Sequence, residues 1–244
     1  MQLLVSDYDG TFDTSEKDIR INCEKIGEFI KNGNLFVLSS GRSYNNLMGK
    51  VEEHKIPYSF LSCSDGSFLF DNHGIMHYAG LISHDVVDIT SKLESLNRHR
   101  KFEYTYPKDY STEYNKFNLL GSVVFTIDEE KIDKEFLDAF EEIRRNHPEY
   151  QYDVYSYKNV HFFLIRPVGI SKSTPIEYLE DKFDISKSEI YTIGDNINDK
   201  ELIRDYNGYR IGNNKSVIDV ALRKYNAVHE LIDDIQMQKA LRRF

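Results

Sequence analysis

The sequence is poor in the features on which several protein classes depend. Its 244 residues contain only two cysteines, Cys23 and Cys63, which are far apart and not part of a cluster with histidine. We therefore expect neither a disulfide framework nor a structural zinc site. No stretch is apolar enough to span a bilayer, and the first apolar run meets Asp7 too early to form a signal peptide. These absences predict a cytoplasmic protein that binds no membrane.

Positive charge is also scarce. Lys and Arg number 31 against 40 Asp and Glu, which gives a formal net charge of -9 and a pI near 5.4. Nucleic-acid binders usually carry a basic patch or stripe, so we predict no nucleic-acid partner and favour small-molecule chemistry. A hydrophobic content of 40% over 244 residues allows a substantial core, in one large domain or in a domain with a smaller second one.

Three short apolar runs end abruptly in small or acidic polar residues, and a helical stretch follows each. These runs are Leu3–Asp7, Leu35–Ser40 and Ile190–Asp195, with a helix expected over Lys17–Asn32 and stopped by Gly33. Continuous apolar strands that alternate with helices are typical of a parallel sheet covered on both faces. Because ligands of such sheets bind beyond the carboxyl ends of the strands, we expect the three polar clusters to form one site.

The pattern of elements changes in the middle of the chain, between about Ser83 and Pro167. The expected order there is a helix over His84–Arg98, strands over Phe102–Tyr106 and Ser122–Ile127, a helix over Glu130–Asn146, and strands over Gln151–Tyr155 and Val160–Arg166. This order predicts an inserted antiparallel α+β domain over residues 82–167, with residues 1–81 and 168–244 forming the core domain. Gly80 and Gly169 near the boundaries make hinge motion sterically easy.

The segment Asp7-Tyr8-Asp9-Gly10-Thr11 places two carboxylates on one short turn after a buried strand. Phosphoryl transfer needs a nucleophile, neutralisation of oxygen charge and a proton for the leaving alcohol. We predict that Asp7 attacks phosphorus to form an aspartyl phosphate, while Asp9 protonates the leaving oxygen and later activates water. A calcium loop or a tight turn is the alternative for Asp-x-Asp-Gly alone, although no Glu follows at calcium-loop spacing.

The second strand end, Ser39-Ser40-Gly41-Arg42, suits a phosphate group. The hydroxyl of Ser40 and the backbone N–H groups around Gly41 can hold a phosphate oxygen, and a simple helix N-cap is the alternative. Lys172 precedes a helix expected over Pro175–Phe183 and could offset charge between the carboxylates and the phosphate. A lone Lys is usually a solvated surface side chain, so this assignment depends on the wider pattern.

The third strand end, Gly194-Asp195-Asn196-Ile197-Asn198-Asp199, suits a hard divalent cation. We expect Asp195 to bind Mg²⁺ directly, Asp199 to act on a water bound to it, and Asn198 to orient its neighbours. The alternative is a plain strand-to-helix turn with Asp199 as an acid of the first helical turn.

The order Asp7-x-Asp9-Gly-Thr, Ser40-Gly-Arg, Lys172 and Gly-Asp195-x-x-Asn198-Asp199 resembles the haloacid dehalogenase superfamily, specifically its Cof-type, subclass IIB phosphatases. The resemblance covers nearly the whole chain. It implies an α/β fold, with a Rossmann-like parallel-sheet core and an inserted α+β cap of the C2B type. The inserted segment lies where such a cap would be expected.

The resemblance also implies a role for each matching residue. Asp7 would be both the nucleophile and a Mg²⁺ ligand, and Asp9 would be the acid/base and would bind the metal through its backbone carbonyl. Asp195 would be the third protein ligand, with Asp199 supporting the metal. Phosphate would be contacted by four residues, namely Ser40, Gly41, Lys172 and Asn198.

The sequence departs from the pattern of close relatives at three positions. Ser40 stands where Thr is frequent, and Phe12 stands where Leu is more usual. Asp65, in Ser64-Asp65-Gly66-Ser67, replaces the Asn of an Asn-Gly-Ala turn. Asp65 either closes a turn, which we favour, or places an additional anion near the site and alters substrate preference.

The favoured function is Mg²⁺-dependent hydrolysis of a small phosphate monoester, with a sugar or polyol phosphate as the expected substrate. The inserted segment is rich in amphipathic rings that could contact such a substrate or simply fill the sheet face. They are Tyr104, Tyr106, Tyr110, Tyr114, Tyr152, Tyr155, Tyr157 and His161. One alternative is a sugar phosphomutase of the phosphomannomutase type, and another is a non-catalytic metabolite-binding protein.

Overall fold

The computed structural model describes the chain except residues 97–98, 108–118, 158 and 242–244. The chain divides into two compact units, which we call the core unit and the cap unit. The core unit comprises Met1–Tyr78 and Ser171–Phe244, and the cap unit comprises Ala79–Ile170. The predicted insertion at 82–167 falls within the cap unit. No helix among the described residues is both long and apolar enough to cross a membrane.

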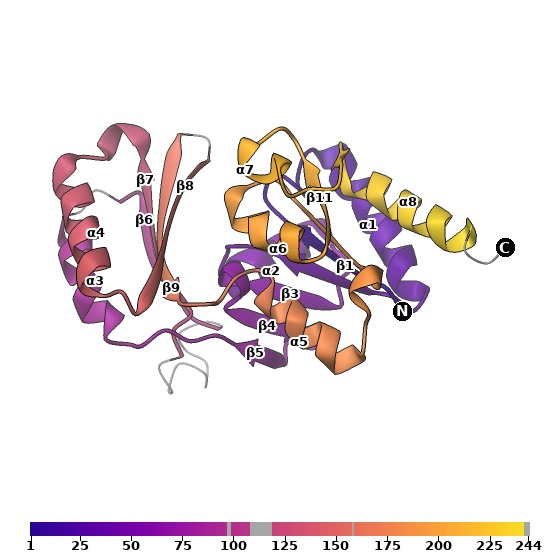
Figure 1. Cartoon of the computed structure of the whole chain (residues 1–244), viewed down its shortest axis with the longest axis horizontal. Coiled ribbons are helices and arrows are strands. Elements are labelled where there is room, and N and C mark those ends of the chain that lie inside the picture. Colours follow the sequence, from indigo (N-terminus) through magenta and orange to yellow (C-terminus); the bar gives the residue numbers. More distant parts are fainter. Residues whose placement is uncertain (97–98, 108–118, 158, 242–244) are drawn as a thin grey trace. The chain divides into compact units, whose positions relative to one another are not determined.

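An eight-stranded sheet organises the core unit, in the order β12-β11-β10-β1-β2-β3-β4-β5 (Figure 1). Neighbouring strands pair in parallel from β12 to β3, and β4 pairs antiparallel with β3. The strands are β1 (Leu3–Asp7), β2 (Leu35–Ser39), β3 (Phe60–Cys63), β4 (Phe68–Asp71), β5 (Met76–Ala79), β10 (Ile190–Gly194), β11 (Asn207–Ile211) and β12 (Lys224–Tyr225). Every residue of β1 and β10 is buried, as expected for central strands covered on both faces.

The three strands with polar ends are neighbours, because β1 lies between β2 and β10. The parallel register pairs Asp7 of β1 with Ser39 of β2, and Ser6 with Ile193 of β10. All three strands therefore end at the same edge of the sheet, and the loops that follow them meet there.

Helices cover both faces of this sheet. Apolar side chains of α1, α2 and α8 pack on one face, and those of α5 and α6 pack on the other. Figure 1 shows α1 beside α8. The helices are α1 (Glu16–Lys31), α2 (Tyr44–His54), α5 (Thr174–Phe183), α6 (Lys200–Asp205), α7 (Lys215–Ile218) and α8 (Val228–Leu241). The helix expected at 17–32 is α1, and it begins after Ser15, whose hydroxyl accepts the Asp18 N–H.

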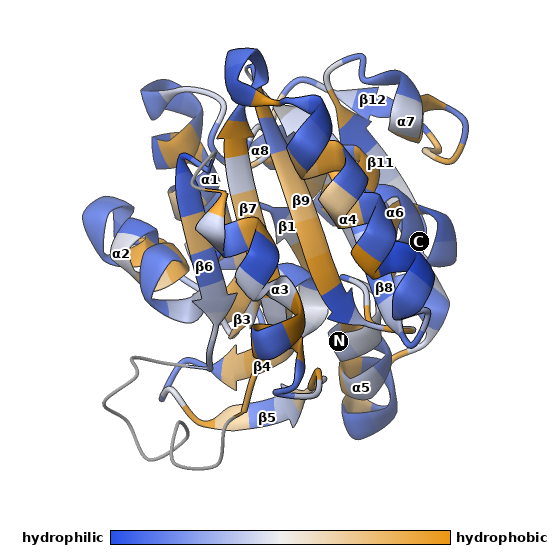
Figure 2. Ribbon diagram, turned by 90° about the vertical axis from the view of Figure 1, so that its left-hand side faces the viewer, coloured by the Kyte–Doolittle hydropathy of each residue, from blue (hydrophilic) through white to orange (hydrophobic). Residues whose placement is uncertain are grey.

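The cap unit is a four-stranded antiparallel sheet, in the order β6-β7-β9-β8, with α3 and α4 packed on one face. Its elements are α3 (Val86–Ser95), β6 (Lys101–Thr105), β7 (Ser122–Asp128), α4 (Lys134–Asn146), β8 (Tyr150–Tyr157) and β9 (Val160–Pro167). Figure 2 colours most of β9 as hydrophobic, in agreement with its central place in this sheet. The α/β core with an inserted α+β unit confirms the predicted fold class.

Several boundaries differ from the sequence expectation. The helix expected from Glu130 begins at Lys134, because Glu129–Lys131 form a 3₁₀ turn and the Asp133 carboxylate caps α4 by accepting the Phe136 N–H at 2.9 Å. The sequence interpretation also did not predict β3, β4 and β5 as strands of the core sheet. Cys23 and Cys63 are free, in agreement with the expected thiols.

Candidate active site

Three carboxylates meet at the edge of the core sheet where β1 and β10 end. One oxygen each of Asp7, Asp195 and Asp199 lies within 4.8 Å of the other two. Asp7 is the last residue of β1, whereas Asp195 and Asp199 flank the turn that leads from β10 into α6. Asp7 and Asp199 are buried and Asp195 is half-buried. Three acidic groups therefore lie close together with little water to screen their repulsion.

Lys172 supplies positive charge inside this cluster. Its Nζ donates hydrogen bonds to Asp7 Oδ1 and to Asp199 Oδ1, each at 2.6 Å. The Lys172 side chain is fully buried, although an isolated lysine in the sequence would be expected at the surface. The wider motif pattern was thus a better guide to its location than the residue type.

The loop after β10 is held rigidly by Asp199. The Asp199 Oδ2 atom accepts the backbone N–H groups of Asp195 and Asn196, both at 3.0 Å. Thr11, in the loop after β1, also contacts this loop, since its hydroxyl donates to Asp195 Oδ1 at 2.7 Å. Thr11 was part of the recognised motif, but the sequence interpretation gave it no role.

Gly10 allows the first loop to approach Asp195. It has a φ of 81°, and a Cβ atom at this position would lie 2.8 Å from Asp195 Oδ2. A side chain would therefore be both strained and too close to the carboxylate. Gly10 is therefore required for the close contact between the loop after β1 and the loop after β10.

The close packing of these acids raises the pKa values of Asp7 and Asp195. Burial, together with the charges of Asp199 and Asp195, holds the pKa of Asp7 well above its usual range, although Lys172 opposes the shift. Burial and the charge of Asp199 raise the pKa of Asp195 to about 6. Burial alone would lower the pKa of Lys172, but Asp199 and Asp7 raise it well above its ordinary value. The acids therefore favour the charged form of Lys172, which is one ammonium beside three carboxyl groups.

The cluster has the donor chemistry of a site for a hard divalent cation. Lys172 donates to one Asp7 oxygen and Thr11 donates to one Asp195 oxygen. Within the described part of the chain, the second oxygen of each acid accepts no hydrogen bond. Both Asp199 oxygens already accept hydrogen bonds. Oxygen donors with excess negative charge fit Mg²⁺, and Asp7 and Asp195 have more capacity to bind it than Asp199.

The carboxylate of Asp9 is not in the cluster. It forms a two-point ion pair with Arg42, in which Nε lies 2.8 Å from Asp9 Oδ2 and Nη2 lies 2.7 Å from Asp9 Oδ1. The guanidinium also lies over the Tyr8 ring, 5.5 Å from its centroid. The hydrogen bonds that Arg42 donates to Asp9 raise the pKa of Arg42. The sequence analysis quoted Arg42 as part of a motif but did not predict this pair.

The residues expected to bind phosphate line the same loops. Ser40 is buried, and its Oγ accepts the Arg42 N–H at 3.2 Å. Gly41 follows it in the loop after β2. The side-chain amide of Asn198, in the turn after β10, donates to Asp65 Oδ1 at 3.0 Å. With Lys172, these residues come from three separate segments that converge at one edge of the sheet.

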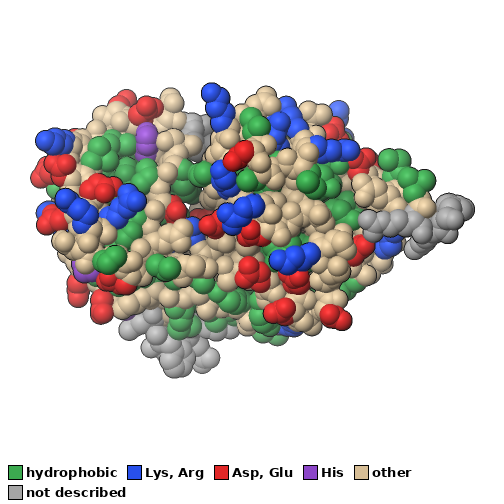
Figure 3. All heavy atoms as spheres, viewed as in Figure 1, with side chains coloured by type: hydrophobic (Ala, Val, Ile, Leu, Met, Phe, Trp, Pro, Cys, Tyr) green, Lys and Arg blue, Asp and Glu red, His purple; other side chains and the backbone are tan. Residues whose placement is uncertain are grey.

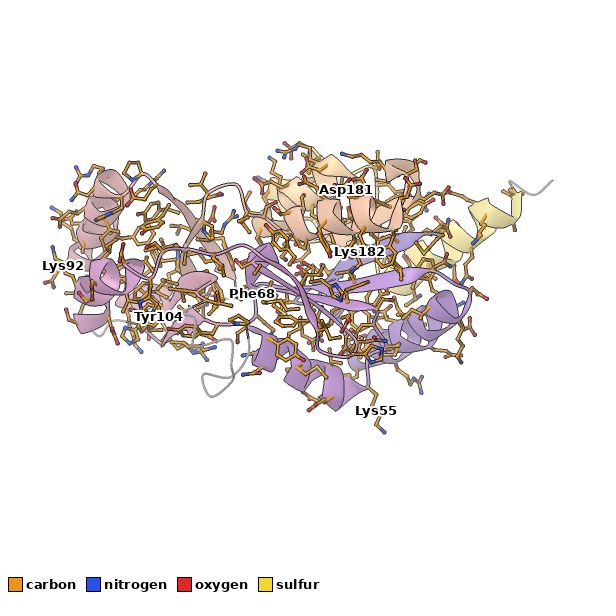
Figure 4. All side chains as sticks on the ribbon, turned by 90° about the horizontal axis from the view of Figure 1, so that it is seen from below. Lys55, Phe68, Lys92, Tyr104, Asp181 and Lys182 are labelled. Atoms are coloured by element: carbon orange, nitrogen blue, oxygen red, sulfur yellow. The ribbon has the colours of Figure 1, made fainter. Side chains whose placement is uncertain are left out.

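Two of the predicted cap tyrosines pack inside the cap unit. The Tyr152 hydroxyl donates to the His147 carbonyl at 2.9 Å, and Tyr104, labelled in Figure 4, contacts Thr90 of α3 at 3.2 Å and packs on Phe102. Tyr155 instead stacks on Phe162, with ring centroids 5.0 Å apart. Strand alternation places this pair on the sheet face opposite α3 and α4, because Phe163 packs against the helices. Tyr110 and Tyr114 lie outside the described residues.

Figure 3 shows the distribution of charged side chains on one face of the structure. On the face of the molecule in Figure 3, the described Lys and Arg side chains are interspersed with Asp and Glu. This mixture provides no broad basic surface on that face for a polyanion.

Comparisons with known proteins assign a family and a fold. The sequence profile of haloacid dehalogenase-like hydrolases matches residues 4–224. A haloacid dehalogenase-like hydrolase from Bacteroides thetaiotaomicron has a similar structure, with a TM-score of 0.75 at 20% identity over 96% of this chain and 99% of that chain. A sugar phosphatase of subclass IIB gives a TM-score of 0.70 at 16% identity over 99% of each chain.

A relative in sequence is found in Buchnera aphidicola subsp. Schizaphis graminum, where it is provisionally named a phosphatase. It is 23% identical over 224 residues, which cover 83% of this chain and 80% of the relative. The structural similarities show a shared fold at low sequence identity.

Proposed function

The chain belongs to the haloacid dehalogenase-like hydrolase family, and we propose that it hydrolyses a small phosphate monoester through a covalent intermediate on Asp7. The observation that carries the proposal is the contact between buried Asp7 and buried Lys172, beside the acids of the third loop. A carboxylate nucleophile at the end of a rigid strand, next to a fixed cation, is suited to attack a phosphate.

The reaction would proceed in two displacements. An oxygen of the Asp7 carboxylate attacks phosphorus, the bond to the ester oxygen breaks, and protonated Asp9 gives its proton to the leaving oxygen. Asp9 then takes a proton from water as the water oxygen attacks phosphorus. The bond between Asp7 and phosphorus breaks, which releases inorganic phosphate and restores both acids.

The ion pair with Arg42 bears on the role of Asp9. Both Asp9 oxygens accept N–H groups of Arg42, so the ion pair holds this carboxyl group apart from the acid cluster. Proton donation therefore requires Asp9 to leave Arg42 and turn towards the Asp7 side of the loop.

Mg²⁺ would be held by Asp7, Asp195 and the backbone carbonyl of Asp9, with Asp199 in support. When bound, it would supply the positive charge that lets the anionic nucleophile and the phosphate approach each other. Lys172, the Ser40 hydroxyl, the Gly41 backbone and the Asn198 amide would bind the phosphate oxygens and hold them in line with Asp7.

A sugar or polyol phosphate is the proposed substrate class. One structural neighbour is a subclass IIB sugar phosphatase, although at 16% identity it supports the fold more than the specificity.

A screen of phosphate monoesters with Mg²⁺ tests the proposal. We expect release of free phosphate from at least one sugar or polyol phosphate, and loss of that release in Asp7→Asn. Asp181→Asn is the matched control, because Asp181 is exposed near the C-terminal end of α5 (Figure 4). Isomerisation of a sugar phosphate without phosphate release would instead indicate a mutase, and turnover retained in Asp7→Asn would exclude the mechanism.

A further inference from the structure

Asp65 lies in the turn between β3 and β4 and is almost completely buried, with 4% of its surface exposed. Its backbone is left-handed, with φ 50° and ψ 39°. Asp and Asn tolerate this conformation better than other side chains that carry a Cβ. The need for a turn explains the backbone of Asp65, but it does not explain why a charged side chain is buried there.

The Asp65 side chain touches two of the loops that form the proposed site. Its Oδ1 atom accepts a hydrogen bond from Asn198 Nδ2 at 3.0 Å, in the loop after β10. Its Oδ2 atom lies against Gly41, where an added Cβ would come within 2.9 Å of it. The Asp65 backbone N–H also donates to the Ser40 carbonyl at 3.2 Å. Asp65 thereby joins the loops after β2 and β10.

We propose that Asp65 is a positioning residue, whose carboxylate fixes the Asn198 amide in the geometry that binds the phosphoryl group. This inference rests on the proposed function. One N–H of the Asn198 amide is used by Asp65, so the plane of the amide is set and its second N–H has a fixed direction. The Asp65 side chain acts through Asn198, because its Oδ1 atom accepts the Asn198 amide, whereas the link to Ser40 is made by the Asp65 backbone N–H.

Two substitutions separate this role from that of a turn residue. Asp65→Gly keeps the left-handed backbone and removes the carboxylate, whereas Asp65→Asn keeps both the backbone and an oxygen that can accept from Asn198. We expect kcat/KM to fall about tenfold to a hundredfold in Asp65→Gly, and to stay within about threefold of wild type in Asp65→Asn. The melting temperatures of both variants should stay close to that of wild type.

A double-mutant cycle tests whether Asp65 acts through Asn198. Once Asn198 is replaced by Ala, removal of the Asp65 carboxylate should cost less than about twofold, because the residue to be positioned is gone. If the losses of Asp65→Gly and Asn198→Ala multiply, or if Asp65→Gly is as active as wild type, the inference is wrong. Loss in Asp65→Gly without rescue in Asp65→Asn would also overturn it.

The side-chain amide resonances of Asn198 provide a test that does not depend on turnover. In wild type, the proton donated to the carboxylate should resonate downfield and exchange slowly, and Asp65→Gly should remove both properties. Failure of the proposed function would appear as a wild-type protein that releases phosphate from no ester. Failure of this inference would appear as an active wild type whose Asn198 amide does not respond to Asp65→Gly.

Discussion

At the scale of single residues, Lys172 has the most constrained environment in the site. Its ammonium contacts Asp7 and Asp199, and its side chain is fully buried. Buried ions are retained only when their charges are compensated. Lys172 therefore stabilises the acid cluster, in addition to its proposed contact with phosphate.

Replacement of Lys172 by Met should destabilise the protein and abolish turnover. Asp7 and Asp199 would lose the ammonium that contacts both, and we expect the free energy of unfolding in EDTA to fall by about 3–5 kcal/mol. Lys182→Met is the control, because Lys182 lies at the surface of α5, and it should cost less than about 1 kcal/mol. Urea unfolding measures the free energy of unfolding of both variants. A Lys172→Met protein as stable as wild type would contradict this account.

Asp195 should make the metal-free protein less stable as the pH rises. Its pKa of about 6 in the folded state lies above the ordinary value of 3.8, so the folded state binds the proton more tightly than the unfolded state. The resulting stabilisation is fully present below about pH 4 and is lost as the pH rises through about 6.

Asp195→Asn removes this titration and can still accept the hydrogen bond from Thr11. In EDTA at pH 7 we expect the variant to melt at a higher temperature than wild type, and we expect the difference to shrink towards pH 4. Thermal unfolding at several pH values measures it. A difference in melting temperature that grows as the pH falls would contradict the raised pKa of Asp195.

At the scale of elements, the cap unit depends on a core of its own. Phe136 of α4 is fully buried, with its ring centroid 5.0 Å from that of Phe163 in β9. Phe136→Ala should therefore cost about 3–5 kcal/mol, whereas Leu137→Ala, at the next and exposed position of the helix, should cost little. Amide hydrogen exchange should show faster exchange in β7 and β9 of Phe136→Ala, with β1 and β10 unchanged. Equal effects of the two substitutions would contradict this packing.

The elements that the sequence predicts well are those with a strong local signal. The runs that became β1, β2 and β10 are continuous and apolar, and their polar ends meet because parallel neighbours end at one edge. The short strands β3, β4 and β5 were not predicted, since runs of four residues give too little periodicity to separate a strand from a loop.

Side-chain contacts inside the site were harder to predict than the identities of its residues. The pair between Asp9 and Arg42 joins positions 33 apart in sequence, and the contact between Asp65 and Asn198 joins positions 133 apart. No local pattern encodes either contact, because each arises only when the loops after different strands meet. The roles assigned to the site residues stay predictions until they are tested by substitution.

At the scale of the whole molecule, the predicted membership of the haloacid dehalogenase family is confirmed. Binding of Mg²⁺ at the acid cluster should stabilise the folded chain, because the unfolded chain does not bring Asp7 and Asp195 together. At a free concentration of about a hundred times Kd, the gain should be about 2.7 kcal/mol. Thermal unfolding should show this gain for wild type and Asp181→Asn, and a much smaller gain for Asp195→Asn. Equal stabilisation of Asp195→Asn would place the cation elsewhere.

The central claim is that Asp7 is the residue that becomes phosphorylated, and beryllofluoride tests it most directly because it mimics a phosphoryl group on a carboxylate. A crystal structure of the protein with Mg²⁺ and beryllofluoride should show beryllium bonded to an oxygen of Asp7, with the Lys172 ammonium beside the fluorides. Asp7→Asn should show no adduct under the same conditions. Beryllium bonded to Asp9, or to any residue other than Asp7, would contradict the proposed mechanism.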